Sequence, residues 1–373
     1  MPISTRRFLL ISGSLLLASL ACNIGGSTPA PTATLVSNQP LSTPQALASL
    51  PAPVPTSAQA TAEPPTATPQ PSYDPATASL SDLPYTHPNG LFELLPPAFW
   101  TVEQDDSGVS FRDPAGIGYL RVQMTNSGYQ LDGPGFEQFV RAREANLFGG
   151  YPNYQAADQQ VEAGDGLASQ SKTFVQEGQL QAVVSFYDQQ GPVIFSVDFW
   201  ETADQAGTYR GLYDEFYNHI QADSQAAFAL PPYGRRYAYT DSQNQYKMEV
   251  PESWQHKPPE EAAPGLEQFE APDGRAEVSA LVYPAAPAYN PPIFVQDLLR
   301  TYLGLEIQVT GEQSLAGGWT QYTWASSDGG RTGVALLVSD TLPTLLVTGS
   351  TDVAYQQIYG NVLESILTSV ARP

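Results

Sequence analysis

Few side chains of this 373-residue sequence have the types and spacing that catalysis or metal binding requires. Asp105 and Asp106 are adjacent, and two carboxylates that a fold holds in the right geometry can hydrolyse a glycosidic bond. Adjacent acids in a loop are usually just solvated, so a hydrolase that uses paired carboxylates is the alternative interpretation. The three histidines, His87, His219 and His256, are far apart and form no zinc-binding motif.

Other motifs for catalysis or metal binding are missing from the sequence. It has neither the Gly-x-Ser-x-Gly turn of serine hydrolases nor the Asp-x-Asp-x-Asp-Gly loop of calcium sites. No serine or cysteine stands in a pattern typical of an activated nucleophile. We therefore predict no catalytic residues, no metal site and no cofactor, and we expect a protein that is not an enzyme.

Cys22 is the only cysteine, so it has no partner for an intramolecular disulfide. It follows two arginines and an apolar run over residues 8–20, which is typical of a signal peptide and too short to predict a membrane-spanning helix. The sequence Ser-Leu-Ala-Cys resembles a lipobox, although the usual Leu three residues before the Cys is replaced by Ser. We predict a signal peptide over residues 1–21 and lipidation of Cys22; a secretory signal with an unrelated thiol is the alternative.

The sequence allows two export routes, the general secretory route and the twin-arginine route. Residues 5–10, Thr-Arg-Arg-Phe-Leu-Leu, resemble the twin-arginine signal that exports folded proteins, although paired arginines are also ordinary in signal peptides. Both routes lead out of the cytoplasm. We expect an extracytoplasmic lipoprotein, anchored to the outer face of the cell membrane through the lipid on Cys22.

The composition changes abruptly after Cys22. From residue 23 to about residue 76, Pro, Thr, Ala and Ser dominate, and Trp and Phe are absent. Such a segment buries too little apolar surface to offset its conformational entropy, and its prolines favour extended stretches. We predict a disordered stalk over residues 22–80 that holds the folded part away from the membrane. A linker without a length requirement is an equally good interpretation.

Acidic residues dominate the charge: 38 Asp and Glu against 16 Lys and Arg give a net charge of −22 at pH 7. Removing Arg6 and Arg7 with the signal peptide leaves 14 Lys and Arg, and the net charge becomes −24. Nucleic acids and anionic lipid surfaces are therefore not expected partners, because both carry negative charge. The expected partner is an envelope protein or polymer.

Two stretches of the sequence share an aromatic residue, a Pro and a Trp in register. They are residues 92–100, FELLPPAFW, and residues 246–254, YKMEVPESW. Both tryptophans follow a Pro at the end of an expected strand. We expect Trp100 and Trp254 to be packed in the core, and a surface platform for a sugar or peptide is the alternative.

Two further matches follow in the same order. Residues 111–116 and 269–274 both have a Phe followed by a Pro-containing turn that ends in Gly. Phe136 and Phe294 then lie at the same offset as the turns. Three ordered matches predict an internal duplication. The predicted order is a first repeat at 81–225, a short linker at 226–238 and a second repeat at 239–373.

Each predicted repeat has the same order of elements. Strand patterns start at Phe92, centre on Val109 and Phe111, and alternate apolar and polar residues over 119–124. A helix is expected from near Pro134, followed by three more strands and a last amphipathic helix. This order predicts an α+β fold in which helices pack on an antiparallel sheet.

This order and the Pro-x-x-Trp motifs that end at Trp100 and Trp254 resemble the PsbP-like domain family. The resemblance covers most of residues 85–372 and implies two tandem PsbP-like α/β/α sandwiches. The bacterial lipoprotein members of that family look like binding or adaptor modules without a shared catalytic motif. The resemblance therefore implies a binding or adaptor role and not a role in photosynthesis.

Overall fold

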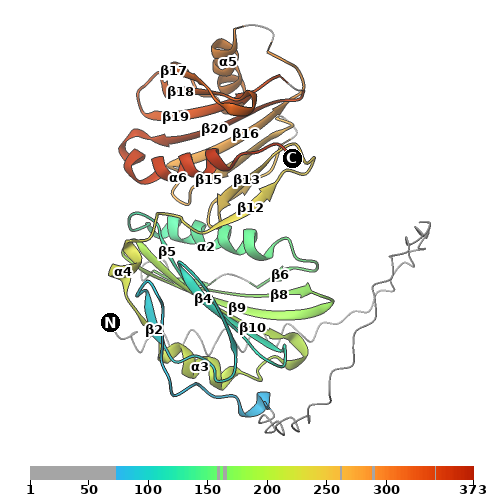
Figure 1. Cartoon of the computed structure of the whole chain (residues 1–373), viewed down its shortest axis with the longest axis vertical. Coiled ribbons are helices and arrows are strands. Elements are labelled where there is room, and N and C mark those ends of the chain that lie inside the picture. The colour runs from blue at the N-terminus through green and yellow to red at the C-terminus, as the bar shows by residue number, and fades with distance from the viewer. Residues whose placement is uncertain (1–72, 158–159, 163–165, 261–262, 288–289, 341) are drawn as a thin grey trace, which may run out of the picture. The chain divides into compact units, whose positions relative to one another are not determined.

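The computed structural model describes residues 73–157, 160–162, 166–260, 263–287, 290–340 and 342–373 (Figure 1). The predicted signal peptide, Cys22 and most of the predicted stalk lie outside the described residues. Residues 73–373 belong to one compact unit. Among the described residues, no helix combines the length and apolar composition needed to cross a membrane.

The first large sheet is antiparallel and has the strand order β3-β4-β5-β10-β9-β8-β6, with β7 also paired to β8. Its strands are β3 (Thr101–Asp105), β4 (Gly108–Arg112), β5 (Gly118–Asn126), β6 (Gln155–Ala156), β7 (Gln160–Glu162), β8 (Leu167–Gln176), β9 (Gln179–Gln190) and β10 (Val193–Thr202). A small separate sheet joins β1 (Tyr85–Thr86), β2 (Phe92–Leu94) and β11 (Gln221–Ala222). The helices of this half are η2 (Pro75–Thr77), α2 (Gly133–Phe148), η4 (Ala203–Gln205), α3 (Arg210–Asn218) and α4 (Ser224–Phe228).

The second large sheet is also antiparallel, in the order β14-β15-β16-β20-β19-β18-β17. Its strands are β14 (Gln255–Lys257), β15 (Leu266–Glu270), β16 (Ala276–Tyr283), β17 (Ile307–Ser314), β18 (Thr320–Ser326), β19 (Arg331–Val338) and β20 (Thr344–Asp352). A two-stranded ribbon, β12 (Arg236–Thr240) and β13 (Lys247–Pro251), precedes it. The helices are α5 (Pro291–Leu303), η5 (Ala316–Gly318), η6 (Val353–Tyr355) and α6 (Gln356–Ser369).

Helices pack on both faces of each large sheet. In β10, Phe199 lies in the core cluster of α3, whereas Ile194 lies in the cluster of α2. In β20, Val347 lies in the cluster of α6, whereas Leu346 lies in the cluster of α5. Because successive strand side chains point to opposite faces, each sheet is the middle layer between two helices. The predicted α+β fold is confirmed.

One predicted strand has a different place from the one its sequence pattern indicates. The strand that starts at Phe92 forms, but it belongs to the small sheet, and the edge of the large sheet is β3. All five residues of β3 are exposed. An exposed edge strand has no alternation of apolar and polar residues, so the sequence pattern does not reveal it.

Both motif tryptophans are buried, as expected. Trp254 is completely buried and makes edge contacts with the rings of Tyr233 and Tyr359. Trp100 is 5% exposed, and its ring centroid lies 5.1 Å from that of Tyr209. Neither ring has the exposed face that a surface platform needs.

The first described residues pack against the first half of the chain, although the sequence places them in the stalk. The Tyr73 hydroxyl accepts a hydrogen bond of 2.9 Å from Trp100 Nε1 and lies 3.2 Å from the Tyr209 hydroxyl. Leu80 forms a β-bridge with Pro97, and both Tyr73 and Leu80 pack on the core cluster. Tyr73 and Leu80 change the composition of this Pro- and Thr-rich segment little, so the sequence does not reveal that it packs on the core.

Candidate functional site

Of the two adjacent carboxylates, Asp105 forms an ion pair with Arg235. The Asp105 carboxylate accepts hydrogen bonds from Ser107 N at 2.8 Å and from Arg235 Nη1 at 2.5 Å. Burial opposes ionisation of Asp105, but Arg235 and the Ser107 donors outweigh burial and lower its pKa. A general acid in hydrolysis needs a raised pKa, so Asp105 is suited to an ion pair instead.

The histidines have structural contacts. His87 is buried; its Nδ1 accepts a hydrogen bond from Asn89 N, and its Nε2 lies 2.9 Å from Asp105 O. The His256 ring stacks on Phe269 with the planes 12° apart. Among the residues that the structure describes, no three His, Cys, Asp or Glu side chains are grouped so that they could hold a metal ion.

A cluster of charged side chains is buried between α2 and the first sheet. Asp198 of β10 is completely buried and pairs with Arg121 and Arg143, whose nitrogens lie 2.8 and 3.0 Å from its Oδ2. Lys172 Nζ donates to Ser185 Oγ at 2.6 Å, and it also pairs with Glu144. We call these residues the charged cluster. Its acids and bases pair with one another, so the cluster needs no ligand.

At the place of the pair Asp198 and Arg121, the second sheet has two neutral side chains. Asp198 pairs with Arg121 across β10 and β5, and the corresponding pair in β20 and β16 is Thr348 with Ser279. Trp324 Nε1 donates to Thr348 Oγ1 at 3.1 Å. A hydrogen bond from Trp324 to Thr348 thus lies where the first sheet has ion pairs, and any function of the two halves need not be the same.

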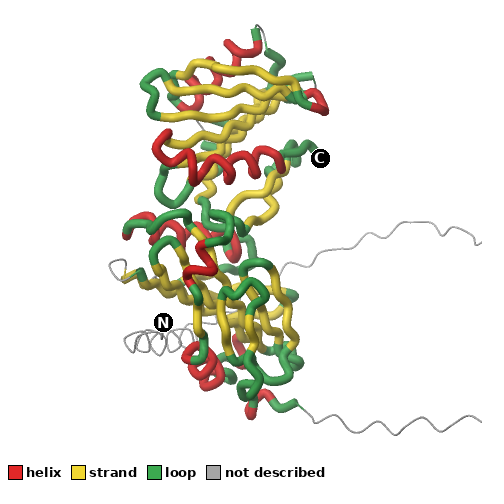
Figure 2. The backbone as a smooth tube through the Cα atoms, turned by 60° about the vertical axis from the view of Figure 1, so that its left-hand side comes forward, coloured by secondary structure: helices red, strands yellow, loops and turns green. Residues whose placement is uncertain are grey.

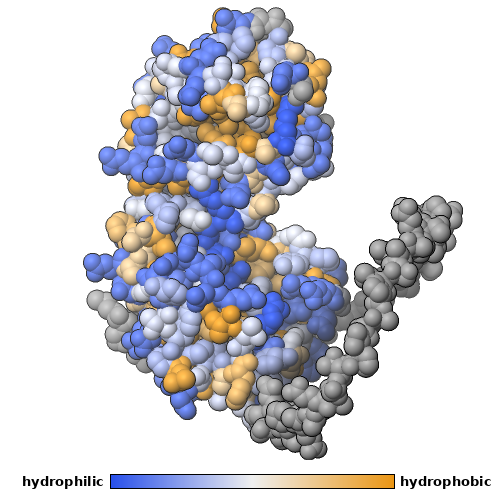
Figure 3. Space-filling view, viewed as in Figure 1, coloured by the Kyte–Doolittle hydropathy of each residue, from blue (hydrophilic) through white to orange (hydrophobic). Residues whose placement is uncertain are grey.

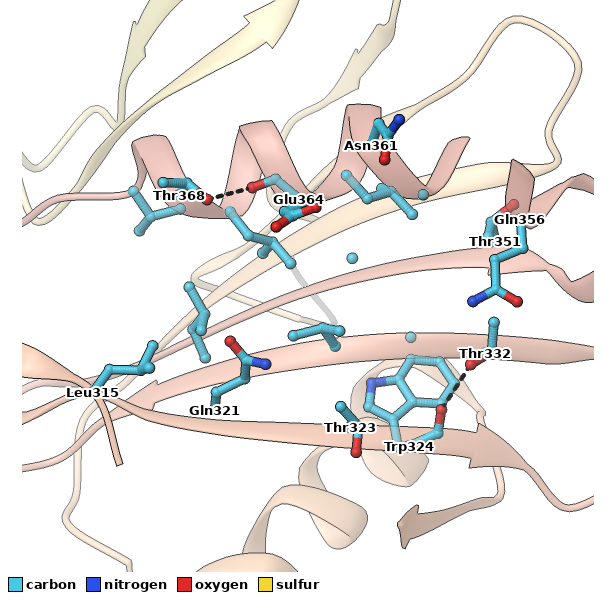
Figure 4. A pocket seen from close by; sticks show the side chains of 18 of the residues that line it. Leu315, Gln321, Thr323, Trp324, Thr332, Thr351, Gln356, Asn361, Glu364 and Thr368 are labelled. Atoms are coloured by element: carbon cyan, nitrogen blue, oxygen red, sulfur yellow. Dashed lines mark hydrogen bonds between the residues drawn. The ribbon is translucent and has the colours of Figure 1, made fainter. Parts of the chain in front are cut away.

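A cleft of about 740 Å³ lies beside α6, and we call it the α6 cleft (Figure 4). Its floor consists of alternate residues of four strands, which share one face of the second sheet. These residues are Thr310 of β17, Gln321, Thr323 and Ala325 of β18, Thr332, Val334 and Leu336 of β19, and Gly349 and Thr351 of β20.

Helix α6 forms the opposite wall, and it runs across this face of the sheet (Figure 2). Gln356, Gly360, Glu364 and Thr368 recur every four residues along α6 and line the cleft. Leu363 and Leu367 lie beside this row and are buried. The turn between β17 and β18 contributes Leu315 and Trp319. Figure 3 shows apolar side chains exposed beside α6 on this half of the chain.

The α6 cleft has a mixed floor, in which threonines lie among small and aliphatic side chains such as Ala325 and Val334, and a polar rim. Its threonines are engaged locally: Thr310 Oγ1 donates to Thr323 Oγ1, Thr332 Oγ1 to Trp324 O, and Thr368 Oγ1 to Glu364 O.

The rim has four polar side chains with no such local partner. Gln321, Gln356, Asn361 and Glu364 make no side-chain hydrogen bond or ion pair with the part of the chain that the structure describes. Gln356, Asn361 and Glu364 are exposed to solvent, so their polar groups are free to form hydrogen bonds with a ligand.

The electrostatic character of the α6 cleft is mildly negative. Among its lining residues, Glu364 carries a charge, and Lys, Arg and His are absent. An anionic ligand would find no positive partner there, whereas a neutral or cationic ligand would be accepted. The hydroxyl, amide and carboxylate groups of the lining can all form hydrogen bonds with a ligand.

The sequence motifs did not reveal the α6 cleft. They marked the buried side of the last helix, including Tyr359 and Leu363, because the apolar spacing is strong there. The signal for the cleft is the row from Gln356 to Thr368, four residues apart, which contains a Gly and no large apolar side chain. A helix with a second narrow stripe of small and amide residues is consistent with a cleft, but that stripe looks like an ordinary solvent-facing side.

No family model and no curated protein matches this chain. Among solved structures, it is similar to cyanobacterial PsbP (CyanoP) from Synechocystis sp. PCC 6803, with 14% identity over 38% of this chain and 92% of that chain, and a TM-score of 0.29. It is also similar to LpqN, described as involved in cell envelope biogenesis of Mycobacterium tuberculosis, with 13% identity over 37% of this chain and 88% of that chain, and a TM-score of 0.27.

A third similar structure is that of the immunity protein TplEi of the T6SS of Pseudomonas aeruginosa, complexed with "L" peptide. Its identity is 13% over 74% of this chain and 98% of that chain, with a TM-score of 0.21. The similar structures thus include a PsbP protein, the family that the Pro-x-x-Trp motifs resemble. Identities and TM-scores this low assign no function to the chain.

Proposed function

We propose that this chain is a membrane-anchored extracytoplasmic lipoprotein whose folded part is a non-catalytic binding or adaptor module for an envelope protein or polymer. The observation that carries the proposal is the α6 cleft, in which amides without a partner in the described chain stand beside a floor of threonines and aliphatic side chains. The partner is held in this cleft. The lipid on Cys22 keeps the cleft outside the membrane surface, at the end of the stalk.

The proposal includes two tandem PsbP-like domains at residues 81–225 and 239–373. The shared order of strands supports it: β4-β5-β10-β9-β8 in the first sheet corresponds to β15-β16-β20-β19-β18 in the second. The differences between the charged cluster and its neutral counterpart fit a duplication in which the two copies took different roles.

The anchor is tested at the only cysteine. The wild-type protein is expected to incorporate labelled fatty acid and to sediment with membranes, and Cys22→Ala is expected to do neither, because the thiol is the acceptor of the lipid. Cys22→Ala protein that still carries label and stays with the membrane would contradict the proposal.

The α6 cleft is tested by filling it. Gly360 lies in the row of α6 that lines the cleft, and a Cβ added to it would meet only Gln356 Cγ, at 3.9 Å. Gly360→Phe should place a ring in the cleft without strain, and it should not weaken α6, because Gly is the poorer helix former. Capture of partners from native membranes by tagged full-length protein is expected to fall at least tenfold.

A matched control is available in the other half. Gly211 lies in α3 and is exposed, and a Cβ at this position meets nothing within 4 Å. Gly211→Phe adds the same ring to a helix away from the α6 cleft and is expected to capture partners like the wild type. Equal capture by both variants would show that the cleft is not the binding site.

A further inference from the structure

We infer that the ligand of the α6 cleft is an extended peptide segment with apolar side chains and a lysine or arginine next to Glu364. This inference rests on the proposed function, because it takes the α6 cleft to be a binding site. It adds the chemical class and the charge of the ligand.

The dimensions of the α6 cleft fit a short extended segment. Gln356 and Glu364 are eight residues apart in α6, which corresponds to about 12 Å along the helix axis. Four residues of an extended chain cover about 13 Å. Both ends of this wall are therefore within reach of one segment of four or five residues.

The polar groups of the rim match a peptide backbone. Gln321 of β18 and Gln356 and Asn361 of α6 each offer an amide donor and an amide acceptor; Gln356 extends toward the sheet, and Asn361 lies on the outer side of α6 at the rim (Figure 4). A peptide backbone offers the same two groups at every residue. An acyl chain offers neither and would leave the three amides without partners, which favours the peptide.

The floor of the α6 cleft argues against a sugar as the main ligand. Sugars are commonly held against exposed aromatic faces, and Trp319 is partly exposed here. Trp324, however, is 1% exposed, and its indole nitrogen already bonds Thr348. The other apolar groups are aliphatic: Val334 is partly exposed, which suits an aliphatic peptide side chain, and Leu336 and Leu363 are buried.

The charge of Glu364 indicates where the peptide ligand has its basic residue. Glu364 supplies the negative charge of the lining, and no positively charged side chain lines the cleft. A lysine or arginine of the peptide would gain a partner at Glu364, whereas an acidic residue at the same place would meet a like charge without compensation.

The probe is a fluorescein-labelled heptapeptide of alternating leucine and serine with one central lysine, capped at both ends. Binding to full-length protein is measured by fluorescence anisotropy. The lysine peptide is expected to bind about fivefold more tightly than the same peptide with glutamate, since an exposed ion pair stabilises by up to about 1 kcal/mol. Glu364→Gln should remove most of this preference, and Glu312→Gln, an exposed change on β17, should keep it.

A glycan probe, a lipid probe and the Gly360→Phe variant distinguish a peptide ligand from a glycan or a lipid. Gly360→Phe should abolish peptide binding, and maltoheptaose and phosphatidylcholine vesicles should not compete with the peptide. A different result would overturn the peptide assignment: a glycan or lipid binds, Gly360→Phe blocks this binding, and no peptide binds. The α6 cleft would then remain a binding site. If native partners are captured equally by Gly360→Phe and wild type, the inference and the proposed function both fail.

Discussion

Replacing Asp198 with Asn is expected to lower the free energy of unfolding by about 3–5 kcal/mol. Asp198 is completely buried and accepts hydrogen bonds from Arg121 and Arg143 at 2.9 and 3.0 Å. Without its negative charge, the guanidinium groups of Arg121 and Arg143 lose this counter-charge, whereas Lys172 keeps its pair with Glu144. A typical domain is stable by about 5–15 kcal/mol, so the loss should be visible as a lower midpoint in urea.

The same carboxylate predicts sensitivity to acid. Burial alone would raise the pKa of Asp198, but Arg143, Arg121 and Lys172 outweigh burial and hold the pKa well below its usual value. A lowered pKa in the folded state means that the stabilisation is present above about pH 4 and is lost as the pH falls further. Wild type should therefore lose stability below about pH 4, and Asp198→Asn should show less of this loss.

A surface acid serves as the control for this change. Asp204 in η4 is exposed, and Asp204→Asn is expected to change the free energy of unfolding by less than about 0.5 kcal/mol. If Asp198→Asn unfolds at the same urea concentration as Asp204→Asn, the charged cluster does not support the first sheet.

Trp254→Ala is the second change with a large expected effect, about 3–5 kcal/mol. The ring is completely buried, and the core cluster that contains it also contains Val250 of β13 and Phe139 of α2. Removing it leaves a cavity among these groups. Trp254→Phe keeps most of the apolar contact and is expected to cost less.

Calorimetry should show how far this loss spreads. Asn146 Nδ2 of α2 donates to the backbone carbonyls of Glu252 and Trp254, each at 2.8 Å, so the corner of the second predicted repeat touches the first. The Trp254→Ala protein is therefore expected to melt in one transition at a lower temperature. Melting unchanged from wild type would contradict the packed role of Trp254.

Sequence motifs predicted the parts of the fold that depend on strong local signals. Asp132 accepts a hydrogen bond from Gly135 N at 2.9 Å and caps α2, close to the Pro134 that indicated its start. The burial of Trp100 and Trp254 was predicted because a Pro ends the strand and the large aromatic residue that follows packs into the core. Exposed β3 carries no such signal, and its place followed from pairing with β4.

The candidate site was beyond the reach of the sequence for a different physical reason. The floor of the α6 cleft draws on four strands from Thr310 to Thr351, and only the register of those strands brings their side chains to one face. The charged cluster likewise joins Arg121, Lys172 and Asp198, which are far apart in the chain. Pairing between distant segments forms both the α6 cleft and the charged cluster. Local sequence patterns do not reveal which distant segments pair.

Photo-crosslinking in intact cells tests most directly whether the α6 cleft binds the partner. A benzoylphenylalanine at Gln321 or at Asn361 places the reactive group on either wall of the α6 cleft, and Glu215 on the exposed side of α3 gives the control position. A discrete adduct is expected from both cleft positions and none from Glu215. Adducts from Glu215 alone, or from none of the three positions, would contradict the claim that the α6 cleft holds the partner.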